Sequence, residues 1–319
     1  RDRLSFTQST LNATCTITYS ATGFAPFSET VNTKAIPTAI TVSTSSVTDT
    51  SGEWISGTWY TGSTNTSNVT PTSVQDQLTS AATATLQSSG AITVSNAVSS
   101  STVGAALTLT TTGGDVTLNA AISNAGPLAV IGTNINANQN LTTAGASSRL
   151  LLQASGNILV ASSITIQTNG ADIVLWGSSA GGSGNISVGN STCINTNASC
   201  DVSSNSTTGG NIYMGGGASG STHPTGPIVN SSSVNAISFG TGINSGISVL
   251  SGGGDIFIRG SSNVNGVSLW SGFTLKATTG SITLAGTSSG TAQGVRIAAS
   301  GTSNISSAKT TGDAITITG

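Results

Sequence analysis

The chain has 319 residues, of which 36% are hydrophobic and 6% are charged, and 41 are glycine. Ordinary globular proteins carry about 25% charged residues, but the hydrophobic share here is large enough for an apolar interior, which excludes charge-driven disorder. The net charge of −2, with only 8 Lys and Arg, provides no basic surface for a phosphate backbone and argues against nucleic acid as a partner.

Residues 1–45 form the first segment of the chain. They alternate apolar and polar positions at 14–19 and 39–42, with Pro26 and Pro37 between these stretches. This pattern predicts either a small β module or an extended arm. The first residues lack the apolar stretch of a signal peptide, so we expect a processed chain or a piece of a longer one.

Residues 46–88 contain an aromatic cluster and one short helical pattern. Residues 71–78 predict a helix with Ser73 as its N-cap. We interpret this segment as an N-terminal cap, since the open edge of a terminal β coil otherwise invites further strand pairing. Trp54 and Trp59 are expected in the core of the cap, and a carbohydrate platform is the alternative.

Residues 89–319 repeat one short phrase, in which Gly and a small polar residue precede an apolar-x-apolar strand. The regular copies begin at Gly90, Gly114, Gly156, Gly184, Gly210, Gly254 and Gly280, and copies with one extra residue begin at Gly170 and Gly312. Their spacing indicates a unit of roughly 21 to 28 residues. Each unit holds two or three short strands separated by Gly, Ser and Asn turns.

A single unit of this kind buries too few aliphatic side chains to offset the entropy of ordering its backbone. Stacked units share that cost through ladder hydrogen bonds and a common core. The sequence therefore predicts an all-β protein: a right-handed parallel β-helix (β-solenoid) of about nine to ten coils over residues 89–319. A β-sandwich is the main rival, but its strands are usually longer.

Cys193 and Cys200 bracket six residues that are mostly Ser, Thr and Asn. We interpret them as a disulfide pair, which suits an oxidising compartment; two free thiols are the alternative, and a metal site would need more ligands. Cys15 then has no partner among the other cysteines of the sequence, and we expect either a free thiol or a disulfide to another chain. The apolar runs at 128–131 and 150–152 are too short to span a membrane.

Few residues are candidates for catalysis. His223 lies in an expected turn, and we interpret it as a solvated loop histidine and not as a catalytic residue. Asp115, Asp255 and Asp313 each follow a repeat glycine, so a β-helix would stack their positions. Other copies carry a neutral residue there: Asn157, Asn185, Asn211 and Ser281. We therefore expect a structural polar ladder, with cation binding and catalysis as alternatives, and no catalytic residue, metal or cofactor.

Trp176 and Trp270 each end a strand in the phrase Leu-Trp, and alternation points both side chains outward. An exposed indole can stack on a sugar ring or cover another subunit. The sequence thus marks both residues as candidates for a glycan or subunit contact, with local packing beneath a loop as the alternative.

The phrases at 114–122, 134–138 and 171–176 resemble the repeats of filamentous-haemagglutinin-type exoproteins, which are large secreted bacterial surface proteins. The resemblance covers residues 46–319 and implies an exported right-handed parallel β-helix that serves as a stalk, adhesin or filament. The chain lacks the Asn-Pro-Asn-Gly signature of the family's secretion domain, and it lacks Arg-Gly-Asp.

These observations predict a non-enzymatic, extracellular structural protein: the β-helical stalk of a surface adhesin, or a filament subunit. Its expected partners are further copies stacked end to end and host or surface glycans or proteins. The alternative is a polysaccharide-binding or polysaccharide-degrading β-helix protein.

Overall fold

The computed structural model describes residues 14–19, 27–32, 35–44, 52–61, 66–197, 199–218, 222–242, 244–298 and 301–319. Parts of the expected N-terminal module, residues 1–13, 20–26 and 33–34, lie outside the described residues.

Three sheets run the length of the molecule, and we number them by the order in which each coil visits them. The first sheet contains β4 (Gly52–Ile55), β5 (Thr58–Thr61), β7 (Thr83–Ser88), β10 (Ala106–Thr111), β13 (Leu128–Gly132), β16 (Leu150–Ala154), β19 (Ile173–Trp176), β22 (Ile212–Gly215), β23 (Ile228–Asn230), β26 (Ile256–Ser262), β29 (Ile282–Ser288) and β32 (Ile315–Thr318). The second contains β3 (Ile40–Val42), β6 (Ser67–Val69), β8 (Ile92–Val94), β11 (Val116–Leu118), β14 (Ile135–Ala137), β17 (Ile158–Val160), β20 (Ile186–Val188), β24 (Ile237–Phe239), β27 (Val267–Leu269) and β30 (Val295–Ile297). The third contains β9 (Val98–Ser100), β12 (Ile122–Asn124), β15 (Leu141–Thr143), β18 (Thr165–Gln167), β21 (Cys193–Asn195), β25 (Ser248–Ser251), β28 (Thr274–Ala277) and β31 (Asn304–Ser307).

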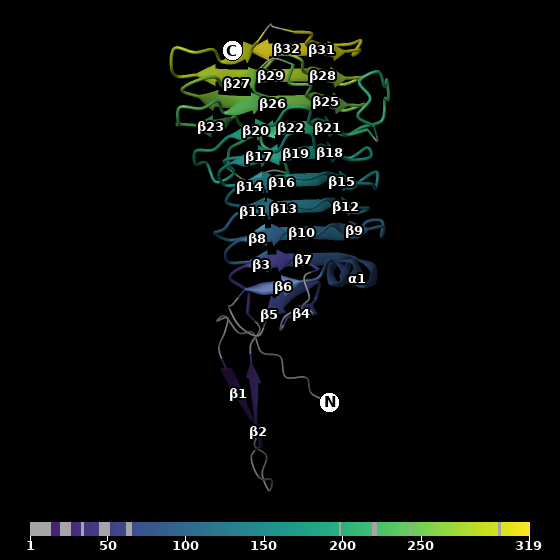
Figure 1. Ribbon diagram of the computed structural model, residues 1–319, viewed down its shortest axis with the longest axis vertical. Helices are drawn as coiled ribbons and strands as arrows, with labels where there is room; N and C mark the ends of the chain where they lie inside the picture. Colours follow the sequence, from purple (N-terminus) through teal and green to yellow (C-terminus); the bar gives the residue numbers. More distant parts are fainter. Residues whose placement is uncertain are drawn as a thin grey trace.

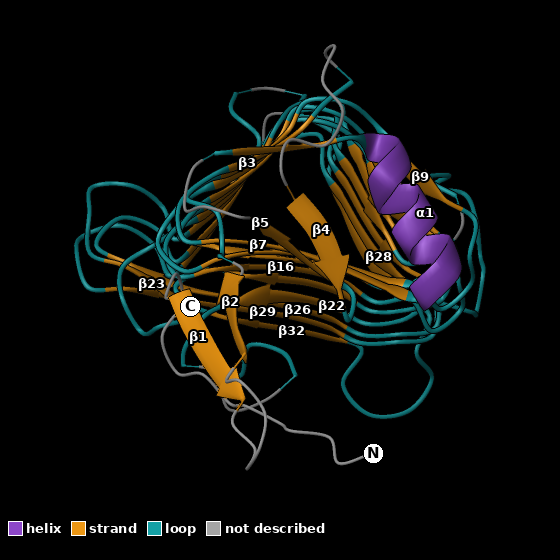
Figure 2. Ribbon diagram, turned by 90° about the horizontal axis from the view of Figure 1, so that it is seen from below, coloured by secondary structure: helices purple, strands orange, loops and turns teal. Residues whose placement is uncertain are grey.

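Each coil takes one strand from each sheet, except that the coil of β22 adds β23 to the first sheet, and the strands pair in parallel with their counterparts in neighbouring coils. The described residues form eight complete coils from β7 to β31, and β32 begins another, against about nine to ten expected. The coils stack in chain order along the long axis (Figure 1), and the three sheets form three walls around the interior (Figure 2). The predicted all-β, parallel β-helical fold is confirmed.

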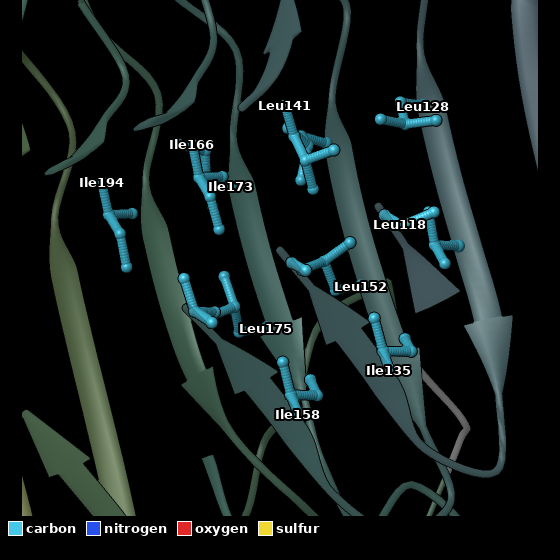
Figure 3. Close-up of a cluster of buried hydrophobic side chains, with 14 of the residues drawn as sticks. Leu118, Leu128, Ile135, Leu141, Leu152, Ile158, Ile166, Ile173, Leu175 and Ile194 are labelled. Carbon is cyan, nitrogen blue, oxygen red and sulfur yellow. The ribbon is translucent and has the colours of Figure 1, made fainter. Parts of the chain in front are cut away.

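The interior consists of aliphatic columns, because alternate residues of every strand point inward. On the first sheet, one column pairs Leu107 with Leu128, Leu128 with Leu150 and Leu150 with Ile173, and all four are buried. Figure 3 shows such side chains from several strands meeting in the interior. Each fully buried Leu or Ile stabilises the fold by about 1.5 to 3 kcal/mol.

Polar side chains that point inward at the corners bind backbone carbonyls. Asn124 Nδ2 donates to the carbonyl oxygens of Ala105 and Pro127, at 2.7 and 2.9 Å. Thr196 Oγ1 donates to the carbonyl of Gly210 at 2.9 Å. These donors add hydrogen bonds at the corners, where the Pro127 carbonyl also accepts the Leu107 backbone N–H at 2.9 Å and the Gly210 carbonyl also accepts the Ser251 hydroxyl at 3.2 Å.

The glycine-led phrases occupy two different corners, which the sequence pattern did not separate. Those beginning at Gly114 and Gly184 lead into strands of the second sheet, whereas those at Gly210 and Gly254 lead into strands of the first. At both corners, successive turns lie in direct contact. A Cβ on Gly184 would overlap the carbonyl of Gly156, and one on Gly254 would overlap that of Gly210. Both corners therefore select glycine, and their sequences look alike.

The N-terminal end of the solenoid is covered by α1 (Pro71–Ala81), which packs against β7 and β9 and buries Val74 and Leu78. Its N-cap is Thr70 and not Ser73: Thr70 Oγ1 accepts a hydrogen bond from the Ser73 backbone N–H at 3.2 Å. The prediction was wrong by three residues because Pro71 already fits the first helical turn.

Two tryptophans complete this cap. The Trp59 side chain is 1% exposed, and its Nε1 donates to Ser67 Oγ at 2.9 Å. Trp54 is half-buried, meets the Trp59 ring edge-on with centroids 5.3 Å apart, and donates to Ser73 Oγ. Both indoles thus pack within the cap.

Strand β3 lies between β6 and β8 in the second sheet, so residues 40–42 belong structurally with the cap. The expected boundary at residue 45 separated them from it. Before β3, β1 (Thr14–Tyr19) and β2 (Phe27–Asn32) form an antiparallel hairpin that extends beyond the capped end (Figure 1). Among the described helical residues, no segment has the length and apolar character needed to cross a membrane.

Candidate functional site

A ladder of polar side chains follows the corner before the second sheet, with one residue from each of four successive coils. Asp115 Oδ1 accepts hydrogen bonds from the backbone N–H and the Nδ2 of Asn134, at 3.1 and 2.9 Å. Asn134 Oδ1 in turn accepts from the backbone N–H of Asn157, and Asn157 Oδ1 from that of Asn185, both at 2.9 Å. The side chains of Asp115, Asn134 and Asn157 therefore each bind the backbone of the coil that follows.

A second ladder follows the corner before the first sheet. Asp172 Oδ1 accepts from the Asn211 backbone N–H at 2.7 Å, and Asn211 Oδ1 from the Asp255 N–H at 2.8 Å. Asp255 Oδ1 accepts from the N–H and the hydroxyl of Ser281, at 2.6 and 2.9 Å. The structure thus places Asp115 and Asp255 on different corners and does not bring them together.

Asp313 belongs to neither ladder. The register pairs Ile282 with Ile315, so the position over Ser281 is Ala314, and Asp313 is exposed in the turn before it. The expectation that Asp115, Asp255 and Asp313 share one polar ladder was therefore wrong, although a polar ladder is present at both corners. Among the described residues, no group of three or more His, Cys, Asp or Glu side chains could hold a metal ion.

An open groove of about 260 Å³ lies against the first of these ladders, on the outer surface of the second sheet. The ladder side chains form part of its wall, and the outward positions of β14, β17 and β20, together with Ile158, form the rest. The lining residues are Asp115, Asn134, Asn136, Asn157, Ile158, Leu159, Asn185 and Ser187. Leu159 is 46% exposed, although it is a large aliphatic residue.

Cys193 and Cys200 are joined by a disulfide, with Cα atoms 6.1 Å apart. The loop after it, up to β22, lies across the third sheet and reaches β28, two coils further on. There Lys276 Nζ donates to the carbonyl oxygens of Val202 and Ser204, at 2.9 and 2.7 Å, and to Asn205 Oδ1 at 3.0 Å. These groups give the ammonium three acceptors and fix the loop to the solenoid.

Asp201 stabilises the turn within this loop. Its Oδ1 accepts from the hydroxyl and the backbone N–H of Ser203, at 2.7 and 2.8 Å. These hydrogen bonds lower the pKa of Asp201 below its ordinary value, and the positive charge of Lys276 lowers it further.

Trp176 points outward from β19, as the alternation predicts, but it is only 2% exposed. The loop between β22 and β23 covers it, and its Nε1 donates to the Gly217 carbonyl at 2.8 Å. Its candidate role in a glycan or subunit contact is therefore wrong for this structure, because no ring face is exposed. The alternative of packing beneath a loop is what the structure shows.

Trp270 is half-buried, and the Arg296 guanidinium lies 4.3 Å from its ring centroid. A cation–π contact of this kind stabilises by about 0.5 to 1 kcal/mol at an exposed site. One face of the indole is thus already in contact with Arg296.

His223 is half-buried and not simply solvated, contrary to expectation. Its ring stacks on Tyr213 with centroids 4.2 Å apart, and Tyr213 stacks on Phe257 of the next coil at 5.2 Å. Arg149 Nη2 donates to the Thr222 carbonyl, and Arg259 Nη1 donates to the Thr225 carbonyl at 3.1 Å. Together these side chains hold the loop that covers Trp176.

Burial within this aromatic cluster raises the pKa of Tyr213, and the negative charges of Asp172 and Asp255 raise it further. Burial lowers the pKa of Arg149, while Asp172 opposes that change. Both faces of the Tyr213 ring are covered, by His223 and by Phe257. The cluster therefore holds the loop in place, and the Tyr213 ring has no open face for stacking.

Several of these features escaped the sequence reasoning. Asp172 occupies the same ladder as Asp255, but the additional residue Ala171 between it and Gly170 hid the equivalence. Asn136 and Leu159 gave no signal, because a groove depends on which outward positions stack. If successive copies of the repeat are aligned in register, their outward positions can be compared, and this comparison places Asn136 beside Leu159.

Searches against protein-family models, curated proteins and solved structures found no match to this chain.

Proposed function

We propose that this chain is a non-enzymatic, extracellular structural protein, a rod-like segment of a bacterial surface adhesin or filament. The observation that carries the proposal is the unbroken stack of inward aliphatic columns across eight coils. Such a stack makes a stiff spacer, because every coil is bonded to its neighbours along three sheets.

The outer surface supports the same role. Its polar residues are used in ladders that join successive coils, as Asn157 joins Asn134 to Asn185. The disulfide between Cys193 and Cys200 supports an oxidising location outside the cytoplasm. The resemblance of the repeats to filamentous-haemagglutinin-type exoproteins supports the assignment to a surface stalk, with host or surface glycans or proteins as partners.

End-to-end contact between copies is a further part of the proposal. Parallel pairing along three sheets joins each coil to the next, and the same pairing would join one copy to another. Sedimentation velocity tests this contact: association should rise with concentration and be lost in Ile317→Lys.

Immunogold labelling of intact cells that make the natural protein tests the main proposal. Antibodies raised against the folded chain should label the cell surface or extracellular filaments without permeabilisation. Labelling only after the cells are opened would overturn it. The alternative of a polysaccharide-degrading enzyme is tested with the variants Asp115→Ala and Asp255→Ala. If the purified wild type shows glycan-cleaving activity, both variants should show the same activity, whereas a loss of activity would support the enzyme.

A further inference from the structure

The groove on the second sheet differs from the other recesses of the described surface. In the aromatic cluster, both faces of the Tyr213 ring are covered. The small cavity beside Lys276 lies under a loop that the ammonium already binds. The groove along Asn134, Asn157 and Asn185 is larger, about 260 Å³ against about 140 Å³, and its lining comes from four successive coils.

The ladder decides which polar atoms of the groove are available to a ligand. The Oδ1 atoms of Asp115, Asn134 and Asn157 accept backbone N–H groups, so they are already engaged. Within the described part of the chain, the Nδ2 groups of Asn157 and Asn185 make no hydrogen bond. The ladder therefore presents amide donors to the groove, together with the second oxygen of the Asp115 carboxylate.

The opposite wall supplies complementary groups. Asn136 and Ser187 offer a further amide and a hydroxyl, and the half-exposed Leu159 lies between them in the outward column of the sheet. An aliphatic surface flanked by donors and acceptors suits a ligand that has an apolar face and hydroxyl groups at its edge. Sugar rings have this construction.

The charge of the groove lining limits which ligands can bind there. Asp115 is the one ionisable side chain of the lining, so an anionic chain would meet repulsion and no compensating cation. A divalent metal would need several oxygen ligands, and the ladder oxygens are occupied. We infer that the groove binds a neutral carbohydrate chain lying along the rod axis, across the coils of Asn136, Leu159 and Ser187.

The geometry of the repeat favours such a chain. Successive coils are about 4.8 Å apart, so two coils span about 10 Å, which is on the order of a disaccharide length. The ladder also fixes the side chains before binding: Asn134 is held by two hydrogen bonds to Asp115. Side chains that are already ordered lose less entropy when a ligand binds. The inference is independent of the rod function, which would stand without it.

Saturation-transfer NMR and calorimetry on the whole chain test this inference, with cellotetraose, maltotetraose, mannotetraose and chitotetraose as neutral probes and a heparin tetrasaccharide as the anionic one. At least one neutral probe should bind. The variants Leu159→Ser and Asn136→Ala should each weaken that binding about tenfold or more. Thr93→Ala, in the same outward column but outside the groove, is the matched control and should bind as the wild type does.

Binding of no neutral probe, or binding that survives both groove variants, would overturn the inference. Binding of the heparin fragment alone would do the same, as would binding that disappears in EDTA, which would indicate a metal. Circular dichroism of each variant separates these outcomes from loss of fold. Neither Leu159 nor Asn136 points into the core, so both variants should retain the wild-type spectrum.

Discussion

The coils from β7 to β18 and the coils from β19 to β25 differ in length but share one core. Along one inward column, Ala84, Leu107, Leu128, Leu150 and Ile173 follow each other at intervals of 23, 21, 22 and 23 residues. The next two intervals, to Ile212 and to Ile256, are 39 and 44 residues. The inward residues nevertheless stay in register, so the additional residues leave and return at the corners.

This difference shows that the buried core residues fix the register between coils, whereas the length and sequence of the loops vary at the corners. Each long loop of the second region has its own attachment to the solenoid: Lys276 holds one, and Arg149 and Arg259 hold the other. The first region has short turns, and most of the groove along Asn134, Asn157 and Asn185 lies on its outer surface, while Asn185 and Ser187 come from the first coil of the second region. Core variants should therefore cost the same in both regions, whereas corner variants should act locally.

Removing one core side chain from each region has the largest expected effect on stability. It tests whether a core variant lowers the free energy of unfolding equally in the two regions. Leu152→Ala and Ile212→Ala should each lower the free energy of unfolding by about 2 to 5 kcal/mol, since both side chains are fully buried. Chemical denaturation measures both. The outward variant Thr117→Ala should stay within about 0.5 kcal/mol of the wild type. A cost below about 1 kcal/mol for Ile212→Ala alone would show that the long coils are loosely packed.

Removing the disulfide should have the next largest effect. The double variant Cys193→Ser, Cys200→Ser should lose about 2 kcal/mol, because the bond closes a loop with a sequence separation of only 7 residues. Denaturation with and without reductant measures the change. Reductant should bring the wild type to the stability of the variant and leave the variant unaffected. An equal response of both proteins would contradict the assignment of the stabilisation to this bond.

Releasing the loop that follows the disulfide should have a smaller effect. Lys276→Met removes three hydrogen bonds of an exposed ammonium and should cost about 1 kcal/mol. Hydrogen exchange should increase in residues 199–208 and stay unchanged in the core strands. Lys309→Met is the matched control, with no expected change. Faster exchange throughout β25 and β28 would show that the loop is part of the core after all.

The pH dependence at Tyr213 is the smallest expected effect. Burial and the charges of Asp172 and Asp255 raise its pKa above the ordinary 10.0. A raised pKa means that stability present below about pH 10 is lost as the pH rises through the folded-state pKa. The free energy of unfolding should therefore fall more steeply above about pH 10 in the wild type than in Tyr213→Phe. Equal slopes would contradict a raised pKa at Tyr213, whose side chain is half-buried.

Much of the architecture could be predicted from the sequence because, in a solenoid, the core residues of each coil are recognisable within one short stretch of sequence. Alternation in Ile282-Thr-Leu284 identifies the inward residues without knowledge of any distant contact. The cysteine pairing was accessible for the same reason, since both residues belong to one short loop. The glycine at each turn was equally visible.

What failed were the features that depend on how one coil lies over another. Trp176 looked exposed because its cover comes from a loop some forty residues later, in which the Gly217 carbonyl accepts the indole N–H. Asp115 and Asp255 looked equivalent because two corners impose the same glycine. The groove beside Asn157 arises from outward residues of separate coils, which no single repeat contains.

Pairwise cysteine cross-linking on the outer surface of the first sheet tests the stacked register most directly. Thr108 and Ala129 are partners in adjacent coils, whereas Thr108 and Leu151 are two coils apart. In a Cys15→Ser background, cysteines at 108 and 129 should form a disulfide, since adjacent strands are about 4.8 Å apart. Cysteines at 108 and 151 should stay reduced. Cross-linking of the 108 and 151 pair, or of neither pair, would contradict the parallel stack from which every other conclusion follows.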